Sequence, residues 1–251
     1  MSESRTELNG KVALITGGAH RIGAQISTLL HQQGMNVVVH YHRSEHAALN
    51  LVGQFNQQRP HSAAAISANL LDLPSLHNLI LTTHQYWQRL DVLVNNASTF
   101  YATPLAQTSE NQWLDLLGTN LKAPFFLIQA AHEFLKQSQG NIVNIVDIHA
   151  HKPLKGYPVY SIAKAGLVML TKAMARELGP EVRVNAIAPG AILWPEQALD
   201  DATQKEILSR TTLKRCGNPM DIATAALFLI RDAHYTTGHV LTVDGGRSLS
   251  Q

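Results

Sequence analysis

The sequence predicts a doubly wound α/β fold, in which a parallel sheet lies between two layers of helices. Along all 251 residues, short runs rich in valine, isoleucine and leucine alternate with longer segments of helical period. Runs that are apolar at nearly every position are typical of strands covered on both faces, as in a parallel sheet. No linker, repeat or low-complexity tract interrupts the alternation, so we expect one domain over residues 1–251.

Seven strands are expected, and most of them are separated by helices. In order along the chain, their runs are Val12–Thr16, Val37–Tyr41, Ala63–Ala68, Val92–Asn95, Ile142–Asp147, Arg183–Ala188 and Val240–Val243. Strands that alternate with helices indicate parallel pairing instead of a series of hairpins.

Three helical segments bear on function. Two long helices are expected over Glu110–Lys136 and Pro158–Leu178, and Pro124 predicts a kink or break in the first of them. A polar helix is expected over Asp200–Ser209. The segment that contains it, residues 191–210, is interpreted as a lid over the substrate.

Composition excludes several classes of protein. The net charge is only +2 and the 20 basic residues are scattered, unlike the basic stripe of a nucleic-acid-binding protein. No run approaches the roughly 18 apolar residues of a membrane helix, and the polar start has no signal-peptide core, so a cytoplasmic protein is expected. Cys216 is the only cysteine, which excludes an internal disulfide, and it is interpreted as a buried bystander. The 13 histidines show no metal-ligand spacing, so no metal is expected.

A glycine-rich turn follows the first strand and leads into a helix. Glycine permits a tight turn and a close approach of the backbone to a ligand. The free N–H groups and the positive dipole end of the following helix attract a pyrophosphate. A dinucleotide site is therefore predicted at Gly17, Arg21, Ile22 and Gly23, although a tight strand-to-helix turn without a ligand would have the same pattern.

The end of the second strand favours NADPH over NADH. A fold that prefers NAD usually presents Asp or Glu there to the ribose hydroxyls, whereas this chain has His40, Tyr41, His42, Arg43 and Ser44. The guanidinium of Arg43 offers a planar fork for a 2′-phosphate, and Ser44, His40 and His42 are further possible donors. The alternative is a solvated polar turn.

Three polar residues predict a site of proton delivery. Lys164 follows Tyr160 by one helical turn, where its charge is expected to stabilise the phenolate and to lower the cost of giving up the proton. Asp147 lies thirteen residues before Tyr160 and adds a carboxyl group. The set suits reduction of a C=O or C=N bond with Tyr160 as the general acid. Taken alone, a Tyr-x-x-x-Lys pattern also arises by chance.

The motifs, taken together, resemble the short-chain dehydrogenase/reductase superfamily over nearly the whole chain. The resemblance rests on Thr16-Gly17 through Gly23, Asn95-Asn96-Ala97, Asn120, Tyr160 with Lys164, Asn185 with Pro189-Gly190, and Val243-Asp244-Gly245-Gly246. It implies a Rossmann-type sheet and a tetramer in which the two long helices form one interface. It also implies that Asn120 supports a water chain to the lysine and that Lys164 holds the ribose of the cofactor. The further cofactor-binding residues expected are Asn69, Leu70, Asn96, Ala97, Tyr160, Lys164, Pro189 and Gly190.

Three departures from the superfamily pattern resemble pteridine reductases. Arg21 stands in place of the second glycine of the turn, and Asp147 stands where the catalytic serine would be. Ser98 and Phe100 replace the usual glycine and a variable residue after Asn95-Asn96-Ala97. The segments 40–44 and 153–157 are similar to that family as well, including its preference for NADPH.

The departures suit a flat, polar heterocycle, so we expect a pterin or folate as the substrate. Phe100 can cover one face of such a ring and Ser98 can bond its edge, while Arg21 can reach both substrate and phosphate. The expected substrate-binding set is Arg21, Ser98, Phe100, Asp147, Tyr160 and Trp194. The expected reaction is hydride transfer from NADPH to an oxidised or dihydro pterin, with Tyr160, Lys164, Asp147 and Asn120 as the catalytic set.

Other interpretations stay open at this point. Phe100 could be a core aromatic beneath the lid, Arg21 could contact only phosphate, and Asp147 could be a charged strand-end residue without a catalytic use. A generic carbonyl or 3-oxoacyl reductase is the second functional hypothesis. A dinucleotide sensor without catalytic activity is the third, because a fold alone does not establish a function.

Overall fold

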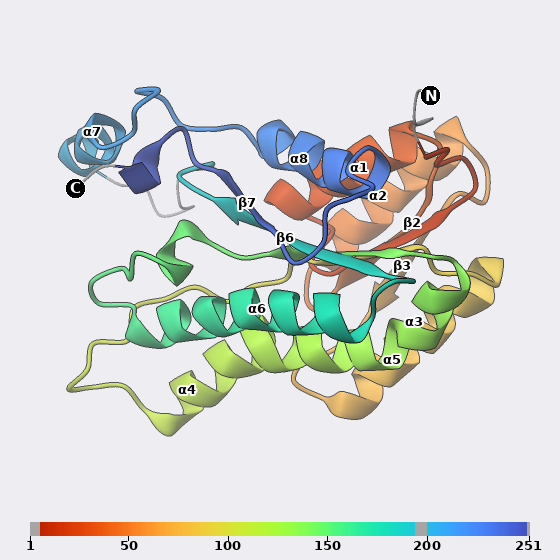
Figure 1. Ribbon diagram of the computed structural model, residues 1–251, viewed down its shortest axis with the longest axis horizontal. Coiled ribbons are helices and arrows are strands. Elements are labelled where there is room, and N and C mark those ends of the chain that lie inside the picture. Colours follow the sequence, from red (N-terminus) through yellow and green to blue (C-terminus); the bar gives the residue numbers. More distant parts are fainter. Residues whose placement is uncertain (1–5, 194–199, 250–251) are drawn as a thin grey trace.

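A computed structural model of the chain describes residues 6–193 and 200–249, so Trp194 and part of the expected lid lie outside the described residues. Seven parallel strands form one sheet in the order β3-β2-β1-β4-β5-β6-β7 (Figure 1). The strands are β1 Val12–Ile15, β2 Asn36–Tyr41, β3 Ala63–Ser67, β4 Val92–Asn95, β5 Asn141–Ile145, β6 Arg183–Pro189 and β7 Val240–Val243. The doubly wound α/β prediction is confirmed.

Helices cover both faces of the sheet. They are α1 Arg21–Gln32, α2 Glu45–Gln58, α3 Leu73–Trp87, α4 Glu110–Leu117, α5 Ala123–Gln137, α6 Pro158–Glu177, α7 Asp201–Ser209 and α8 Pro219–Arg231. Helices α1, α2 and α8 lie on one face of the sheet, and α3, α5 and α6 lie on the other (Figure 1). Their buried side chains belong to two separate core clusters, one for each face. Successive residues of β1 point to opposite layers: Val12 and Leu14 join one core, and Ala13 and Ile15 join the other. This two-sided burial explains the continuous apolar runs.

The strand order reverses between β1 and β4, because β1 pairs with β2 on one side and with β4 on the other. In open parallel sheets, ligands bind beyond the carboxyl ends of the strands at such a switch point. The loops after Ile15 and Asn95, which end β1 and β4, are therefore placed where a ligand is expected.

The first long helix breaks as expected, but it does so before the proline. It ends as α4 at Leu117, continues as a π-helical segment over Gly118–Lys122, and resumes as α5 with Pro124 in the first turn. A proline in a helix removes one N–H donor and crowds the carbonyl four residues earlier, and the wider π turn accommodates this. The π segment carries Asn120, whose side chain is 1% exposed.

Several expected boundaries and burials differ from those observed. The fifth strand ends at Ile145, so Asp147 lies beyond it, where it caps a short 3₁₀ helix, Ile148–Ala150. Cys216 was expected to be buried but is partly exposed. In the lid region, Asp200 caps α7 by accepting a hydrogen bond from the Thr203 amide at 2.7 Å, and no residue of α7 is buried.

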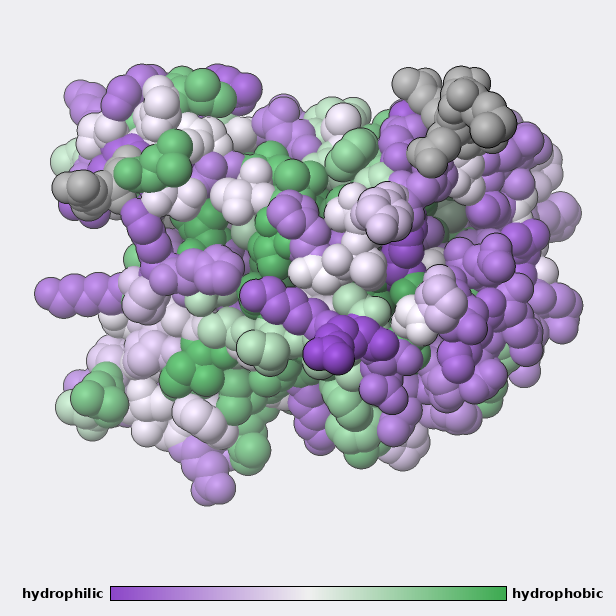
Figure 2. All heavy atoms as spheres, in the orientation of Figure 1, coloured by the Kyte–Doolittle hydropathy of each residue, from purple (hydrophilic) through white to green (hydrophobic). Residues whose placement is uncertain are grey.

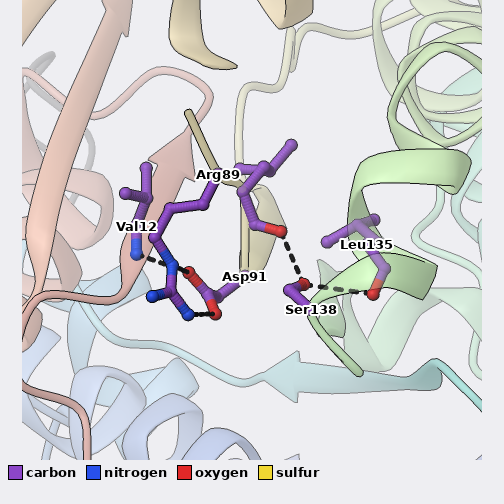
Figure 3. Close-up of polar contacts among 6 residues, drawn as sticks. Val12, Arg89, Asp91, Leu135 and Ser138 are labelled. Atoms are coloured by element: carbon purple, nitrogen blue, oxygen red, sulfur yellow. Dashed lines mark hydrogen bonds and ion pairs between the residues drawn. The ribbon is translucent and has the colours of Figure 1, made fainter. Parts of the chain in front are cut away.

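The amino-end edge of the sheet is closed by a carboxylate, Asp91, which lies just before β4 and is 2% exposed (Figure 3). It accepts a hydrogen bond from the Val12 amide at 2.8 Å and two from the Arg89 guanidinium, at 2.7 and 2.8 Å. Beside it, the Ser138 hydroxyl donates to the carbonyl of Leu90 at 2.7 Å. This network joins β1, the start of β4 and the end of α5, away from the carboxyl ends of the strands.

The surface carries both hydrophilic and hydrophobic side chains. Figure 2 shows hydrophilic residues covering the right side of the view, while hydrophobic residues are interspersed over α6 and around α8. None of the described helices is long and apolar enough to span a bilayer. Within residues 6–193 and 200–249, no group of three or more His, Cys, Asp or Glu side chains could hold a metal ion.

Candidate active site

A cleft of about 770 Å³ lies beyond the carboxyl ends of the first four strands. This volume is in the range of about 300–1,000 Å³ that is typical of cofactor and small-molecule sites. The residues that line it were mostly expected from the sequence: Gly17, Arg21, Ile22, Gly23, His40, Tyr41, His42, Arg43, Ser44, Asn69, Leu70, Asn96, Ala97 and Ser98. The structure brings together residues as far apart in the sequence as Gly17 and Thr119, as the dinucleotide prediction requires.

The glycine turn between β1 and α1 packs so closely against its neighbours that two of its positions, Gly17 and Gly23, have little or no room for a side chain. Gly17 has φ +60°, and a Cβ there would lie 3.1 Å from the Cα of Ala97. A Cβ on Gly23 would lie 2.2 Å from the Gly17 carbonyl oxygen and 2.5 Å from the Asn96 amide nitrogen. The residues present therefore fit a dinucleotide, because they leave backbone and a helix N-terminus facing the cleft.

Arg21 is the first residue of α1 and has φ +51°, a left-handed backbone conformation that is unfavourable for residues other than glycine. Its side chain is exposed and lines the cleft. A glycine at this position would adopt the same conformation without strain. The role of Arg21 in binding the cofactor or the substrate stays a prediction.

Asn96 and Thr16 hold the turn against the end of β4. The Asn96 side-chain amide donates to the carbonyls of Thr16 and Gly17, at 2.9 and 3.0 Å. The Thr16 hydroxyl oxygen accepts from the amides of Asn96 and Ala97, at 3.0 and 3.1 Å. Asn96 and Ala97 thus line the cleft, as expected, and their hydrogen bonds also hold the glycine turn in position.

The expectation that His40 donates a hydrogen bond to the 2′-phosphate is wrong. His40 is 1% exposed, and both of its ring nitrogens are bonded within the chain, to the Gly17 amide at 3.0 Å and to the Ala68 carbonyl at 3.1 Å. Burial lowers the pKa of His40 to about 4, so the ring is neutral near pH 7. His42 and Arg43 are exposed and line the cleft, and their role toward the 2′-phosphate stays a prediction.

Six residues that line the cleft were not in the predicted set: Ala19, His20, Leu71, Thr99, Asp115 and Thr119. Asp115 accepts a hydrogen bond from the Tyr101 hydroxyl at 2.8 Å, and burial and this carboxylate raise the pKa of Tyr101 to about 12. The spacing of Asp115 and Thr119, just before Asn120, was the available signal, since residues four apart share a helix face.

Pro189 is the last residue of β6, and Gly190 follows it. Gly190 is packed so closely that a Cβ there would lie 2.6 Å from the Cβ of Asp244.

The predicted proton-delivery residues do meet. Tyr160 lies in the first turn of α6, is 5% exposed, and donates its hydroxyl to the Asp147 carboxylate at 2.8 Å. The other carboxylate oxygen accepts from the His149 amide at 2.8 Å, which fixes the orientation of Asp147. Lys164 is 2% exposed, and its Nζ donates to the Ile145 carbonyl at 2.9 Å.

Lys164 was expected to stabilise the phenolate of Tyr160, but the structure does not show this effect. Burial raises the pKa of Tyr160 well above its usual range, and the charge of Asp147 and its hydrogen bond raise it further, whereas Ser98 lowers it slightly. The Nζ of Lys164 lies over the Tyr160 ring, 5.6 Å from its centroid, and points to a carbonyl. Burial lowers the pKa of Lys164 to about 8 while Asp147 raises it. The phenol is thus kept in its proton-bearing form.

Two further aromatic rings, those of Phe100 and Tyr157, lie near the phenol of Tyr160. Phe100 is 51% exposed, stacks on Tyr157 with ring centroids 4.7 Å apart, and meets Tyr160 edge to face at 4.8 Å. The interpretation of Phe100 as a core residue is therefore wrong. Tyr157 was not identified from the sequence as part of the site; it directly precedes α6, which begins at Pro158.

Asn120 connects the π segment to the wall of the site. Its side-chain oxygen accepts from the Ser98 hydroxyl at 2.6 Å, and its amide donates to the carbonyls of Thr99 at 3.0 Å and Leu116 at 2.9 Å. These bonds hold Ser98 and Thr99 at the cleft. They also satisfy a carbonyl of the preceding helix.

Ser98, which lines the cleft, also interacts with the buried phenol of Tyr160, and a candidate dinucleotide site next to a proton-bearing phenol is typical of an oxidoreductase. Residues 17–248 match the profile of the enoyl-(acyl carrier protein) reductase family. Pteridine reductase 1 of Leishmania tarentolae is 32% identical, over 98% of this chain and 99% of that protein. The 3-oxoacyl-[acyl-carrier-protein] reductases of Staphylococcus aureus (37% identical, over 94% of this chain and 97% of that protein) and Synechocystis (36%, over 96% and 98%) are also similar. The chain belongs to the short-chain dehydrogenase/reductase superfamily, whose reductases use a nicotinamide dinucleotide.

Proposed function

We propose that the protein reduces pterins with NADPH. The observation that carries the proposal is the Asp147–Tyr160 hydrogen bond of 2.8 Å beside the exposed ring of Phe100. A flat heterocycle gains from an aromatic face that is open to the site, because stacked rings attract each other beyond their buried area. The similarity to pteridine reductase 1 of Leishmania tarentolae over both full lengths supports the same substrate class.

The chain's own residues supply positioning and a proton. NADPH, when bound, supplies the hydride to a ring carbon of the pterin. The glycine turn and Arg43 would hold its phosphates, and Lys164 would hold its ribose. Tyr160 gives its proton to the adjacent ring nitrogen. Asp147 is partly exposed whereas Tyr160 is buried, so the carboxyl group links the phenol to solvent and can return a proton after each turnover.

A second candidate is reduction of 3-oxoacyl thioesters. It is favoured by the 36–37% identity to 3-oxoacyl-[acyl-carrier-protein] reductases over at least 94% of this chain. Such a substrate is a flexible chain with a single keto group, and it has no planar ring to stack on Phe100. The two candidates therefore differ in what Phe100 and Asp147 contribute.

Replacing Asp147 with serine tests the proposal. We expect the wild type to oxidise NADPH with dihydropterin, dihydrofolate or oxidised pterin, and the D147S variant to lose about 10-fold to 100-fold in kcat for these substrates. The measurement is NADPH oxidation across a panel of pterins, folates, ketones and a 3-oxoacyl thioester at several pH values. Thioester turnover without pterin turnover would establish the second candidate, and an unchanged pH profile of D147S would remove the carboxylate from the reaction.

Replacing Arg43 with alanine is expected to lower kcat/KM for NADPH about tenfold and to leave that for NADH within about twofold, since only NADPH carries the 2′-phosphate that the exposed guanidinium can bind. The measurement is the ratio of the two values in wild type and variant. A wild type that uses both coenzymes equally, or an R43A variant with an unchanged ratio, would contradict the NADPH assignment.

A further inference from the structure

His40 connects three separate elements of the dinucleotide cleft. Its ring accepts a hydrogen bond from the Gly17 amide on Nδ1 at 3.0 Å, and its Nε2 lies 3.1 Å from the Ala68 carbonyl oxygen. Its own backbone carbonyl accepts from the Gly18 amide at 3.0 Å. One residue of β2 therefore binds two successive amides of the turn after β1 and the residue that follows β3.

These partners determine the state of the ring. A backbone N–H can only donate and a carbonyl can only accept, so the imidazole must be neutral with its hydrogen on Nε2. The depressed pKa of His40, about 4, agrees with this, since burial is its main cause and His42 adds to it. A charged ring would direct an N–H at the Gly17 N–H and lose that hydrogen bond.

The bonded atoms adjoin the residues that face the ligand. Gly17 lines the cleft itself, and Ala68 is followed directly by Asn69, which lines it from the other side. Because the amides of Gly17 and Gly18 are already bonded to His40, a phosphate at this turn must use later amides, at the start of α1. The first-turn amides of a helix have no carbonyl partner inside the helix.

We propose that His40 is a positioning residue for the dinucleotide, which fixes the distance between the glycine turn and the end of β3 without touching the 2′-phosphate. The inference rests on the superfamily's cofactor and is independent of which substrate is reduced. It distinguishes His40 from Arg43, which acts on the phosphate directly.

The test compares His40→Leu and His40→Gln with a matched control, His31→Leu. His31 is also a buried histidine (4% exposed), bonded to the Ser62 hydroxyl at 2.7 Å and stacked on Phe55, but it lies at the amino-end edge of the sheet. The dissociation constants of NADPH and NADH are measured by the fluorescence of the bound reduced nicotinamide, without any pterin.

We expect H40L to weaken both dinucleotides about tenfold, which corresponds to 1.4 kcal/mol at 25 °C, with their ratio unchanged. H40Q, which keeps an acceptor and a donor, should recover part of the affinity, and H31L should leave both constants within about twofold. Unchanged constants in H40L, a loss confined to NADPH, or an equal loss in H31L would overturn the proposal.

A second measurement uses the wild type without cofactor and so does not depend on how the variants fold. Nitrogen-15 NMR of the His40 ring at pH 6 should show the neutral Nε2–H tautomer, and the Gly17 amide should be protected from hydrogen exchange. A charged ring, the Nδ1–H tautomer, or a rapidly exchanging Gly17 amide would each overturn the proposal. Because neither measurement involves a pterin, failure here is separate from failure of the proposed function.

Discussion

Replacing Tyr160 with phenylalanine is expected to lower kcat for pterin reduction by about 10²-fold to 10⁴-fold, the usual contribution of a general acid. The change removes only the hydroxyl that donates to Asp147 and leaves the ring that contacts Phe100 and the Lys164 ammonium. Affinity for the dinucleotide should therefore stay within about twofold. The measurements are steady-state kcat with a dihydropterin and the equilibrium dissociation constant of NADPH.

The chain contains a matched control for this substitution. Tyr101 also carries a phenol bonded to a carboxylate at 2.8 Å, that of Asp115, and its pKa is raised to about 12 by burial and by that carboxylate. Its hydroxyl has no part in the proposed proton transfer, so Y101F should retain kcat within a few-fold. A Y160F variant that keeps wild-type kcat, or a Y101F variant that loses as much as Y160F, would contradict Tyr160 as the proton donor.

The fold and the central pair were predictable because local patterns determine them. Apolar runs such as Val37–Tyr41 indicated strands buried on both faces, and the observed strand β2 differs from this run by one residue. The approach of Asp147 to Tyr160 is consistent with the expected topology, since the end of the fifth strand, where Asp147 was expected, and the start of the next helix both lie at the carboxyl edge of the sheet.

The details that were missed depend on contacts between distant segments. All residues of β2 from Val37 to His40 are buried because helices cover both faces of the sheet, whereas His42, just past the end of the strand, is exposed. Only the structure shows that Gly17 and Ala68 are the partners of His40. Likewise, the i, i+4 spacing placed Lys164 near Tyr160, but the direction of the ammonium depends on the Ile145 carbonyl. Spacing predicts which residues are neighbours, and hydrogen bonding decides what each neighbour does.

Replacing Asp91 with alanine is expected to lower the free energy of unfolding by about 3 kcal/mol, because it leaves a buried donor unpaired and breaks a bidentate ion pair. Val12 is 0% exposed and its amide donates to Asp91, while the Asp91 amide donates to the Val12 carbonyl at 2.9 Å, so the loss falls on the pairing of β1 with the chain before β4 (Figure 3). Arg89 is 43% exposed on its side chain and can turn to solvent, so it contributes the smaller share.

Urea unfolding of D91A, D91N and D72A separates these contributions, since the midpoint and the slope together give the free energy in water. Asp72 is an exposed carboxylate that caps α3 by accepting from the Ser75 amide at 3.1 Å, and its loss should lower the free energy of unfolding by only about 1 kcal/mol. D91N keeps an acceptor for the Val12 amide but not the charge, so it should lie between the two. If D91A were no less stable than D72A, the Asp91 network would not hold β1 in place. Because the network lies at the amino-end edge of the sheet, D91A at a temperature where it stays folded should keep the dinucleotide affinity of the wild type.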